Sequence, residues 1–395
     1  MSKQSFAEFE FATKAVRSGL FHDTTTGAIS EHICLSTTFA QKDINEPFGQ
    51  YCYSRSNNPN RESLQVTIAA LEGASYSLAF SSGLAATTAV LQTLATNGHV
   101  ITMMDIYSGT ARYFNKLGQT HGLSVSYVSD LEGDLVEALK IREDTRLIWI
   151  ESPSNPTLTL VDIKQVVEIA HQRGVLMLVD NTFLSPYIQN PLALGADLVL
   201  HSVTKYINGH SDVLMGAVAF NSPELLEKLS FFQNAAGSVP SPFDCWLAHR
   251  GIKTMHLRVK AANDNATAIA SLLKESPLVL QVNYPGLSGK LQRELVLRQH
   301  RLGMGGGMIS FRIRGGAKAA EAFCKASKLF TLAESLGGVE SLCEIPARMT
   351  HGGLSREARQ AAGVFDDMIR LSVGIEGIED LKKDVLSALE EACTS

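Results

Sequence analysis

Short apolar runs alternate with amphipathic segments between residues 77 and 202, and this alternation restricts the fold more than any other feature. The segments between the runs have the periodicity of helices: GLAATTAVLQTLATNG, ARYFNKLGQTHG, DLVEALK and DIKQVVEIAHQRG. The apolar runs indicate strands: SLAFSS, HVITMMD, LSVSYVS, RLIWIES, VLMLVD and ADLVLHS. Strands and helices that alternate in this way predict an α/β fold with a mostly parallel sheet, covered by helices on both faces.

The pattern changes on either side of this region and predicts three parts. Residues 1–60 show little regular periodicity and are expected to form an N-terminal arm. Residues 61–255 contain the alternating segments and form a large domain. Residues 256–395 form a smaller C-terminal α/β domain, where shorter strands such as MISFRI and IRLSVGI alternate with helices.

Composition excludes some classes of function. The 395 residues are 45% hydrophobic and 19% charged, with 35 basic and 40 acidic side chains and a formal charge of −5. Binding to nucleic acid or to an anionic membrane needs clustered Lys and Arg, so neither is expected. The six cysteines are scattered, which predicts free thiols in a reducing compartment. Since the sequence shows neither a signal peptide nor a membrane span, we expect a cytoplasmic protein.

Lys205 and Asp180 both stand where an apolar run ends. Asp180 closes VLMLVD, and Lys205 follows ADLVLHS in the segment HSVTKYINGH. Burial beside an apolar strand lowers the pKa of a lysine, and a neutral lysine can form a Schiff base with a carbonyl group. Because ligands bind at the carboxyl ends of strands in such sheets, the two side chains are expected to share one cleft. A lysine for the aldehyde and an aspartate for the ring nitrogen together indicate pyridoxal phosphate.

A phosphate-binding turn is expected in AFSSGLAAT, residues 79–87. The segment has the pattern of a strand, a Ser-Ser-Gly turn and the start of a helix. Backbone N–H groups at a helix N-terminus favour an anion, Gly83 allows a close approach, and Ser82 adds a hydroxyl donor. Ser202 and Thr204, beside Lys205, are candidates for two further donors.

The whole chain resembles the Cys/Met-metabolism family of pyridoxal phosphate enzymes. The resemblance rests on motifs that occur in register along nearly its full length: YSRSNNPNR (53–61), AFSSGLAATTA (79–89), DIYSGTARYF (105–114), ESPSNPTL (151–158), VDNTFLSPY (179–187), HSVTKYINGHSD (201–212), TLAESLGGVESL (331–342) and MIRLSVGIE (368–376). It implies an aminotransferase-like fold (fold type I), and a homotetramer made of two dimers whose active sites are shared between subunits.

The resemblance also implies roles for individual residues around the cofactor. Lys205 would hold the cofactor and carry the substrate's proton, Asp180 would pair with the ring nitrogen, and Tyr107 would stack on the ring and assist the leaving thiolate. Asn155 would lie near the phenolic oxygen. The phosphate would be held by Ser82, Gly83, Leu84, Ser202 and Thr204, and by Tyr53 and Arg55 of the neighbouring subunit.

For the substrate, the resemblance implies that Arg370 binds the α-carboxylate, with Ser335, Asn155 and Tyr53 nearby. The planar fork of an arginine suits a carboxylate. Glu334 would face the far end of the substrate, where a carboxylate can pair with the second ammonium group of cystathionine. We expect no metal site, because no histidine lies in H-E-x-x-H or an equivalent cluster.

Within the family, the overall resemblance, notably HRLGMGGGMISFRI and FQNAAGSVPSPFD, implies the branch that cleaves L-cystathionine by γ-elimination to L-cysteine, 2-oxobutanoate and ammonia, a transsulfuration reaction. Release of hydrogen sulfide from cysteine or homocysteine is a further expected activity. The methionine γ-lyase branch has a cysteine two residues after the stacking tyrosine, where this chain has Gly109. Glu334 does not separate lyase from synthase, so cystathionine γ-synthase remains an alternative. Cystathionine β-lyase, homoserine-ester sulfhydrylases and, against the indication of Gly109, methionine γ-lyase are further alternatives.

Two other classes of protein are consistent with parts of this pattern. A class I aldolase also uses a Schiff-base lysine, but it needs neither the phosphate turn nor Asp180. A non-enzymatic protein of the same fold would have no reason to contain the full set of residues. The cofactor distinguishes these classes, because a pyridoxal phosphate protein is yellow and should lose that colour on Lys205→Ala.

Overall fold

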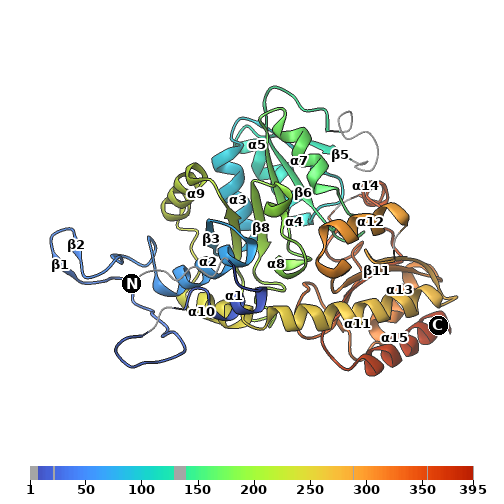
Figure 1. Ribbon diagram of the computed structural model, residues 1–395. Helices are drawn as coiled ribbons and strands as arrows, with labels where there is room; N and C mark the ends of the chain where they lie inside the picture. Colours follow the sequence, from blue (N-terminus) through green and yellow to red (C-terminus); the bar gives the residue numbers. More distant parts are fainter. Residues whose placement is uncertain (1–7, 21–22, 129–138, 288, 354, 395) are drawn as a thin grey trace.

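The computed structural model contains a seven-stranded sheet in its larger part. The structure describes residues 8–20, 23–128, 139–287, 289–353 and 355–394, and Figure 1 shows how their helices and strands are arranged. Five strands that lie side by side in this sheet are parallel to one another, and strand β9 (Gly216–Phe220) is antiparallel to both of its neighbours. The α/β fold with a mostly parallel sheet is thereby confirmed. In spatial order the strands are β3 (Tyr76–Phe80), β9 (Gly216–Phe220), β8 (Leu198–Ser202), β7 (Leu176–Asp180), β6 (Thr145–Glu151), β4 (His99–Met103) and β5 (Ser124–Val128).

Helices cover both faces of this sheet because its strands are apolar on both sides. On β3, Leu78 and Phe80 pack into one core cluster with helices α3, α7 and α9, whereas Ala79 packs into another with α2, α10 and α11. Successive side chains of a strand point to opposite faces, so this division is what the strand geometry requires. The helices are α2 (Pro59–Glu72), α3 (Gly83–Leu94), α7 (Ile163–His171), α9 (Pro223–Ala236), α10 (Pro242–Ile252) and α11 (Met255–Glu275).

The segment ARYFNKLGQTHG, expected to be one helix, lies mostly in one continuous helical run over residues 108–120, whose middle turn is π-helical. Helix α4 (Ser108–Arg112) is followed by a π-helical turn at Tyr113–Leu117 and by α5 (Gly118–Thr120). Such turns widen the helix locally and are frequent at functional sites. A further short helix, α8 (Ser185–Ile188), follows β7. The expected helix DLVEALK lies largely outside the described residues.

A second, five-stranded sheet lies in the C-terminal part. Its order is β10 (Val279–Asn283), β11 (Met308–Ile313), β14 (Met368–Ser372), β13 (Leu342–Glu344) and β12 (Thr331–Leu332). Only the pair β12–β13 is parallel. The helices of this part are α12 (Lys290–Gln299), α13 (Gly316–Ala326), α14 (Arg356–Ala361) and α15 (Ile378–Thr394). The mixed content agrees with the smaller α/β unit that the sequence predicts.

Helix α11 connects the two sheets and runs along the base of the molecule (Figure 1). Its first half, with Met255, Val259 and Ala262, packs into the core beneath the large sheet. Its second half, with Ile269 and Leu273, packs into the core of the C-terminal sheet. The two sheets are therefore joined through one continuous 21-residue helix. Within the described ranges, no helix is long and apolar enough to cross a membrane.

The N-terminal segment projects from the body of the molecule (Figure 1). One part of it is more regular than expected, because Phe11–Arg17 forms helix α1, which packs against α2. The rest of its described residues contain a short antiparallel pair, β1 (Gln41–Asp43) and β2 (Glu46–Pro47), and an isolated bridge between Thr38 and Tyr53. Its apolar side chains face solvent in the single chain: Ile29 is 82% exposed, Ile44 89% and Phe48 69%.

Candidate active site

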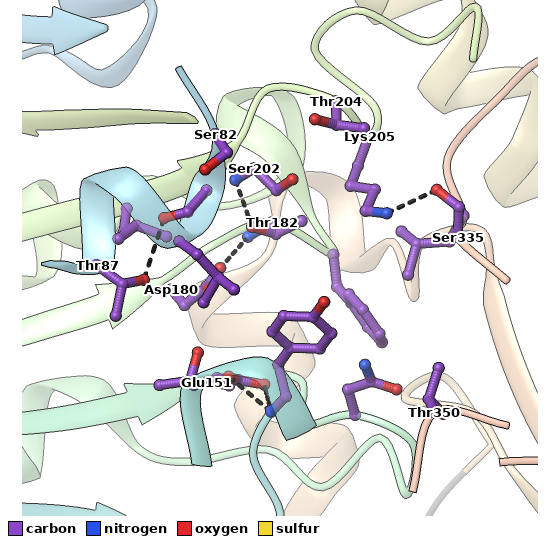
Figure 2. Close-up of a pocket in the computed structure, with 18 of the residues that line it drawn as sticks. Ser82, Thr87, Glu151, Asp180, Thr182, Ser202, Thr204, Lys205, Ser335 and Thr350 are labelled. Atoms are coloured by element: carbon purple, nitrogen blue, oxygen red, sulfur yellow. Dashed lines mark hydrogen bonds between the residues drawn. The ribbon is translucent and has the colours of Figure 1, made fainter. Parts of the chain in front are cut away.

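A pocket of about 450 Å³ lies at the carboxyl ends of the parallel strands, between the two sheets. Most of the residues predicted from the sequence line it, although they come from distant parts of the chain (Figure 2). Among the described residues, only Tyr53 and Arg55 of the predicted set lie outside its lining. The predicted residues that it contains are Ser82, Gly83, Leu84, Tyr107, Asn155, Asp180, Ser202, Thr204, Lys205, Glu334, Ser335 and Arg370.

Lys205 lies in the turn that follows β8, and its side chain points toward Ser335 (Figure 2). Lys205 Nζ donates a hydrogen bond to Ser335 Oγ at 2.6 Å. Burial lowers the pKa of Lys205 to about 8, and Arg370 adds to this effect. The turn itself is held by Arg258, whose guanidinium donates to the carbonyl oxygens of Tyr206 and Ile207 at 2.9 and 3.2 Å.

Asp180 and Glu151 are the last residues of two adjacent parallel strands and are paired in register. Asp180 Oδ1 accepts a hydrogen bond from the Thr182 backbone N–H at 3.0 Å. Both carboxylate oxygens of Glu151 accept from the Tyr107 backbone N–H, at 2.9 and 3.0 Å. Burial raises the pKa of both acids, and Asp180 raises that of Glu151 further. Glu151 is missing from the predicted set, although it closes an apolar run as Asp180 does.

The predicted phosphate turn lies at the start of α3. Ser82 is the N-cap, and its Oγ accepts a hydrogen bond from the Ala85 backbone N–H at 3.0 Å. A Cβ atom on Gly83 would lie 3.4 Å from Ser202 Cβ, so the turn after β8 packs closely against this helix end. Thr204 Oγ1 donates to the Met215 carbonyl at 3.2 Å. Helix dipole, backbone N–H groups and three hydroxyls therefore meet at one end of the pocket.

Arg370 lies in β14 at the opposite side of the pocket and is 2% exposed. Its Nη1 donates to Asn155 Oδ1 at 3.0 Å, and its Nη2 donates to the Ser335 carbonyl at 2.8 Å. Nη1 also lies 3.0 Å from Glu344 Oε1. The sequence analysis missed Glu344, because nothing in CEIPAR sets this acid apart before β13 and β14 are paired.

Comparison with known proteins decides the family. The model of the Cys/Met metabolism PLP-dependent enzymes matches residues 12–390. The chain belongs to this family. Proteins named cystathionine gamma-lyase are similar over almost their whole length: that of Saccharomyces cerevisiae is 54% identical over 97% of this chain and 98% of that protein, and that of Homo sapiens 47% identical over 97% and 94%.

Solved structures show the same fold for this Cys/Met metabolism enzyme. The crystal structure of cystathionine gamma-lyase from yeast superposes with a TM-score of 0.94 at 53% identity, covering 99% of both chains. A cystathionine gamma synthase from Xanthomonas oryzae pv. oryzae, in complex with cystathionine, gives 0.93 at 42% identity, covering 98% of this chain and 99% of that one. Both an enzyme named as a lyase and one named as a synthase therefore share this architecture.

The pocket of this family member fits pyridoxal phosphate. Asp180 makes no ion pair within the described part of the chain, and burial raises its pKa, so a protonated ring nitrogen would satisfy it. The donors at the start of α3 suit a phosphate group, and no carboxylate lies among Ser82, Ser202 and Thr204. Lys205 lies between Asp180, the donors at the start of α3 and Arg370. Because its pKa is about 8, a fraction of its amine is neutral near physiological pH.

Tyr107 precedes α4, lines the pocket wall and is 41% exposed as a residue. Burial nevertheless raises the pKa of its phenol. A Cβ atom on Gly109 would lie 2.4 Å from Tyr107 Cε1, so this glycine makes room for the ring. Gly109, on which the expectation against methionine as main substrate rests, therefore also limits where the Tyr107 ring can lie. Glu334 contributes an exposed carboxylate to the same wall.

Tyr53 and Arg55 lie apart from the pocket lining. Arg55 Nη1 donates to the carbonyl and to the side-chain Oδ1 of Asn234, both at 2.9 Å. Tyr53 is 44% exposed, and the Arg55 guanidinium lies 5.5 Å from the centre of its ring. Both residues are thus on the surface of the single chain, between the projecting segment and α9.

Proposed function

We propose that the protein catalyses the γ-elimination of L-cystathionine, which consumes one water and gives L-cysteine, 2-oxobutanoate and ammonia. The relatives named cystathionine gamma-lyase, at 54% and 47% identity over nearly the full chain, carry this choice of reaction. The pocket supplies a residue for each step. Pyridoxal phosphate, when bound, supplies a covalent link to the substrate amine and accepts the electrons that its Cα–H bond releases.

Arg370 and Glu334 fix the two ends of the substrate. Arg370 binds the α-carboxylate, because it is the pocket's buried guanidinium and is already held rigidly by Asn155 and Ser335. Glu334 faces the second ammonium group. With both ends held, the Cα–H bond lies near Lys205, and positioning of this kind contributes much of an enzyme's rate.

Lys205 moves the protons. Its pKa of about 8 lets the neutral amine take the Cα proton near physiological pH, and Ser335 Oγ at 2.6 Å holds the amine in place. Once Lys205 has given up that proton, the neutral amine takes a second proton from Cβ before the Cγ–S bond breaks. Tyr107, with its raised pKa, retains its phenolic proton at neutral pH and donates it to the departing thiolate.

An assay with L-cystathionine that identifies the products tests the proposal. Cysteine with 2-oxobutanoate supports γ-elimination. Homocysteine with pyruvate would indicate the β-lyase reaction, and net synthesis from cysteine and an activated homoserine with negligible breakdown would indicate the synthase. Lys205→Ala is the control and should abolish turnover. Hydrogen sulfide release from cysteine or homocysteine by the same site can be measured in the same preparation.

We also propose that the enzyme is a homotetramer of two dimers, in which Tyr53 and Arg55 of one subunit reach the phosphate of its neighbour. Both side chains are exposed in the single chain and lie outside the pocket lining, on a segment with little core of its own. The exposed apolar side chains of that segment, such as Ile29 and Phe48, favour burial against a second copy. The arm predicted over residues 1–60 would then be an interface element.

The proposed location is the cytoplasm. Cys34, Cys52, Cys245, Cys324 and Cys343 are free thiols in the structure, which suits a reducing compartment. Tagged protein imaged in its native cell tests this location, and a signal confined to a membrane-bounded compartment would contradict it.

A further inference from the structure

Arg370 already holds a carboxylate of its own chain. Glu344 is the last residue of β13 and lies directly opposite Arg370 of β14 in the antiparallel register. Arg370 Nη1 is 3.0 Å from Glu344 Oε1, and the two side chains are 3% and 1% exposed. A buried ion pair is thus built into the residue that we propose binds the substrate carboxylate.

The guanidinium of Arg370 is only partly used. Arginine has five N–H donors. Nη1 serves Glu344 and Asn155, and Nη2 serves the Ser335 carbonyl. Arg370 Nε is buried and has no hydrogen-bond partner in the described part of the chain, and the same holds for Glu344 Oε2. The Nε N–H is therefore a donor without a partner among the described residues, and Nε together with Nη2 forms the edge of the guanidinium that suits a bidentate carboxylate.

The surroundings of Glu344 contain few charges to balance another anion. Thr350 Oγ1 donates to Glu344 Oε1 at 2.9 Å. Burial raises the pKa of Glu344, while Arg370 and Lys205 oppose this effect and Glu334 adds to it. The charged and titratable groups that act on Glu344 are Arg370 of β14, Lys205 after β8 and Glu334 after β12, and the thiol of Cys324 in α13 also responds to the Glu344 charge. His351 contacts Thr350.

Before a substrate binds, one guanidinium balances one buried carboxylate. A substrate carboxylate on the free edge brings a second negative charge to the same guanidinium, in a site where an unbalanced charge is costly. Uptake of a proton by the resident acid removes that excess charge. The proton would remain on Glu344, whose Oε2 has no hydrogen-bond partner among the described residues.

We propose that Glu344 is a positioning residue that holds Arg370 through Nη1, leaves its Nε–Nη2 edge for the substrate carboxylate, and takes up a proton when that carboxylate binds. The proposal rests on the role of Arg370 given above. It makes carboxylate binding tighter as pH falls, because the bound state holds one more proton. Glu344 also lowers the affinity of the pocket for the substrate carboxylate, since its charge competes with that carboxylate for the same guanidinium.

Glycine is the probe, because it has the α-carboxylate and α-amine of a substrate but no group to eliminate. Its binding to the holoenzyme is measured by titration calorimetry near neutral pH, in two buffers of different ionisation enthalpy, which gives the number of protons exchanged. Glu344→Gln keeps the acceptor for Nη1 and removes the charge. The matched control is Glu340→Gln, which removes an exposed charge four residues away.

When glycine binds, the wild type and E340Q should take up about one proton more per bound glycine than E344Q, as expected if one acid is coupled to binding. Glu344→Asp keeps an ionisable acid and should retain the uptake. With L-cystathionine, E344Q should lower KM about threefold or more with little change in kcat, because the removed charge acts on binding. Equal proton uptake in E344Q and the wild type, or a KM that rises in E344Q, would overturn the proposal.

The test gives an answer even if the enzyme does not turn over cystathionine or if the variant does not fold. Glycine binding requires no turnover, so it remains informative if the enzyme proves not to cleave cystathionine. If E344Q does not fold, infrared difference spectra of the wild type with ¹³C-labelled glycine decide the matter. Binding must then increase the absorption of an unlabelled, protonated carboxylic acid, and an unchanged spectrum in that region would refute proton uptake.

Discussion

Lys205 Nζ donates a hydrogen bond to Ser335 Oγ at 2.6 Å, and this contact joins the proposed base to the other side of the pocket. Lys205 follows a strand of the large sheet, whereas Ser335 follows β12 of the C-terminal sheet. Ser335 has a φ of +83°, a left-handed conformation that is uncommon for a residue other than glycine. Its carbonyl accepts from Arg370. One strained serine therefore sets the spacing between the base and the carboxylate-binding site.

The pH dependence of cofactor loading should show the lowered pKa of Lys205. Only the neutral amine attacks an aldehyde, so the rate at which cofactor-free protein combines with pyridoxal phosphate should rise with pH and level off above about 8. Absorbance at successive pH values measures this rate. Ser335→Ala should move the midpoint to lower pH, because it removes an acceptor that favours the ammonium form. A midpoint near an ordinary lysine pKa of about 10.4 would contradict the burial of this amine.

Asp180→Asn should weaken cofactor binding. The amide has nearly the shape of the carboxylate but cannot compensate a protonated ring nitrogen, and losing one partner of a buried charge pair costs about 2–5 kcal/mol. Titration of the cofactor-free protein with pyridoxal phosphate measures the affinity, and steady-state kinetics the expected fall in kcat. Asp264→Asn, which changes an exposed acid paired with Lys260, is the control. Wild-type affinity and kcat in D180N would remove Asp180 from the proposed site.

Gly216→Ala should disturb the phosphate end of the pocket although residue 216 touches no ligand in the proposal. A Cβ atom there would lie 2.3 Å from the Ser82 carbonyl oxygen and 2.7 Å from Gly83 Cα, both backbone atoms. Overpacking of this kind costs about 1–3 kcal/mol, which thermal unfolding can measure, and cofactor affinity should fall with it. Gly353→Ala, where a new Cβ meets nothing within 4 Å, is the matched control. Equal effects of the two changes would show that the close packing is unimportant.

Sharing of the active site predicts complementation between two inactive variants. Lys205→Ala inactivates a subunit's own pocket, and Arg55→Ala impairs the neighbour's. In a hybrid dimer, one of the two pockets combines an intact Lys205 with an intact Arg55. Random mixing makes about half of the dimers hybrid, so the mixture should recover about a quarter of wild-type activity. Activity is measured after denaturation and joint refolding, with each variant refolded alone as the control. Mass spectrometry verifies that hybrids have formed. If activity is then not recovered, Arg55 acts at the pocket of its own subunit or at no pocket.

The alternation of apolar runs and helical segments was enough to predict the α/β sheet. Strand ends could also be read from it, because apolar runs stop where a polar residue follows, as at Asp180. The same reasoning would have found Glu151, which closes β6. The helix around Tyr113–Leu117 was predicted, but its π-helical turn was not, since these residues have ordinary helical periodicity and tertiary packing decides the turn.

The sequence by itself determined the chemistry available, because the lysine, the aspartate, the phosphate turn and the family motifs are properties of residue type and local order. Only the tertiary structure decided which groups act on one another. Glu344 meets Arg370 across paired strands, and Lys205 meets Ser335 across 130 residues of chain. Such contacts depend on strand register and on the placement of two sheets along one helix. Local sequence carries no record of these long-range distances, since they are set by packing of the whole core.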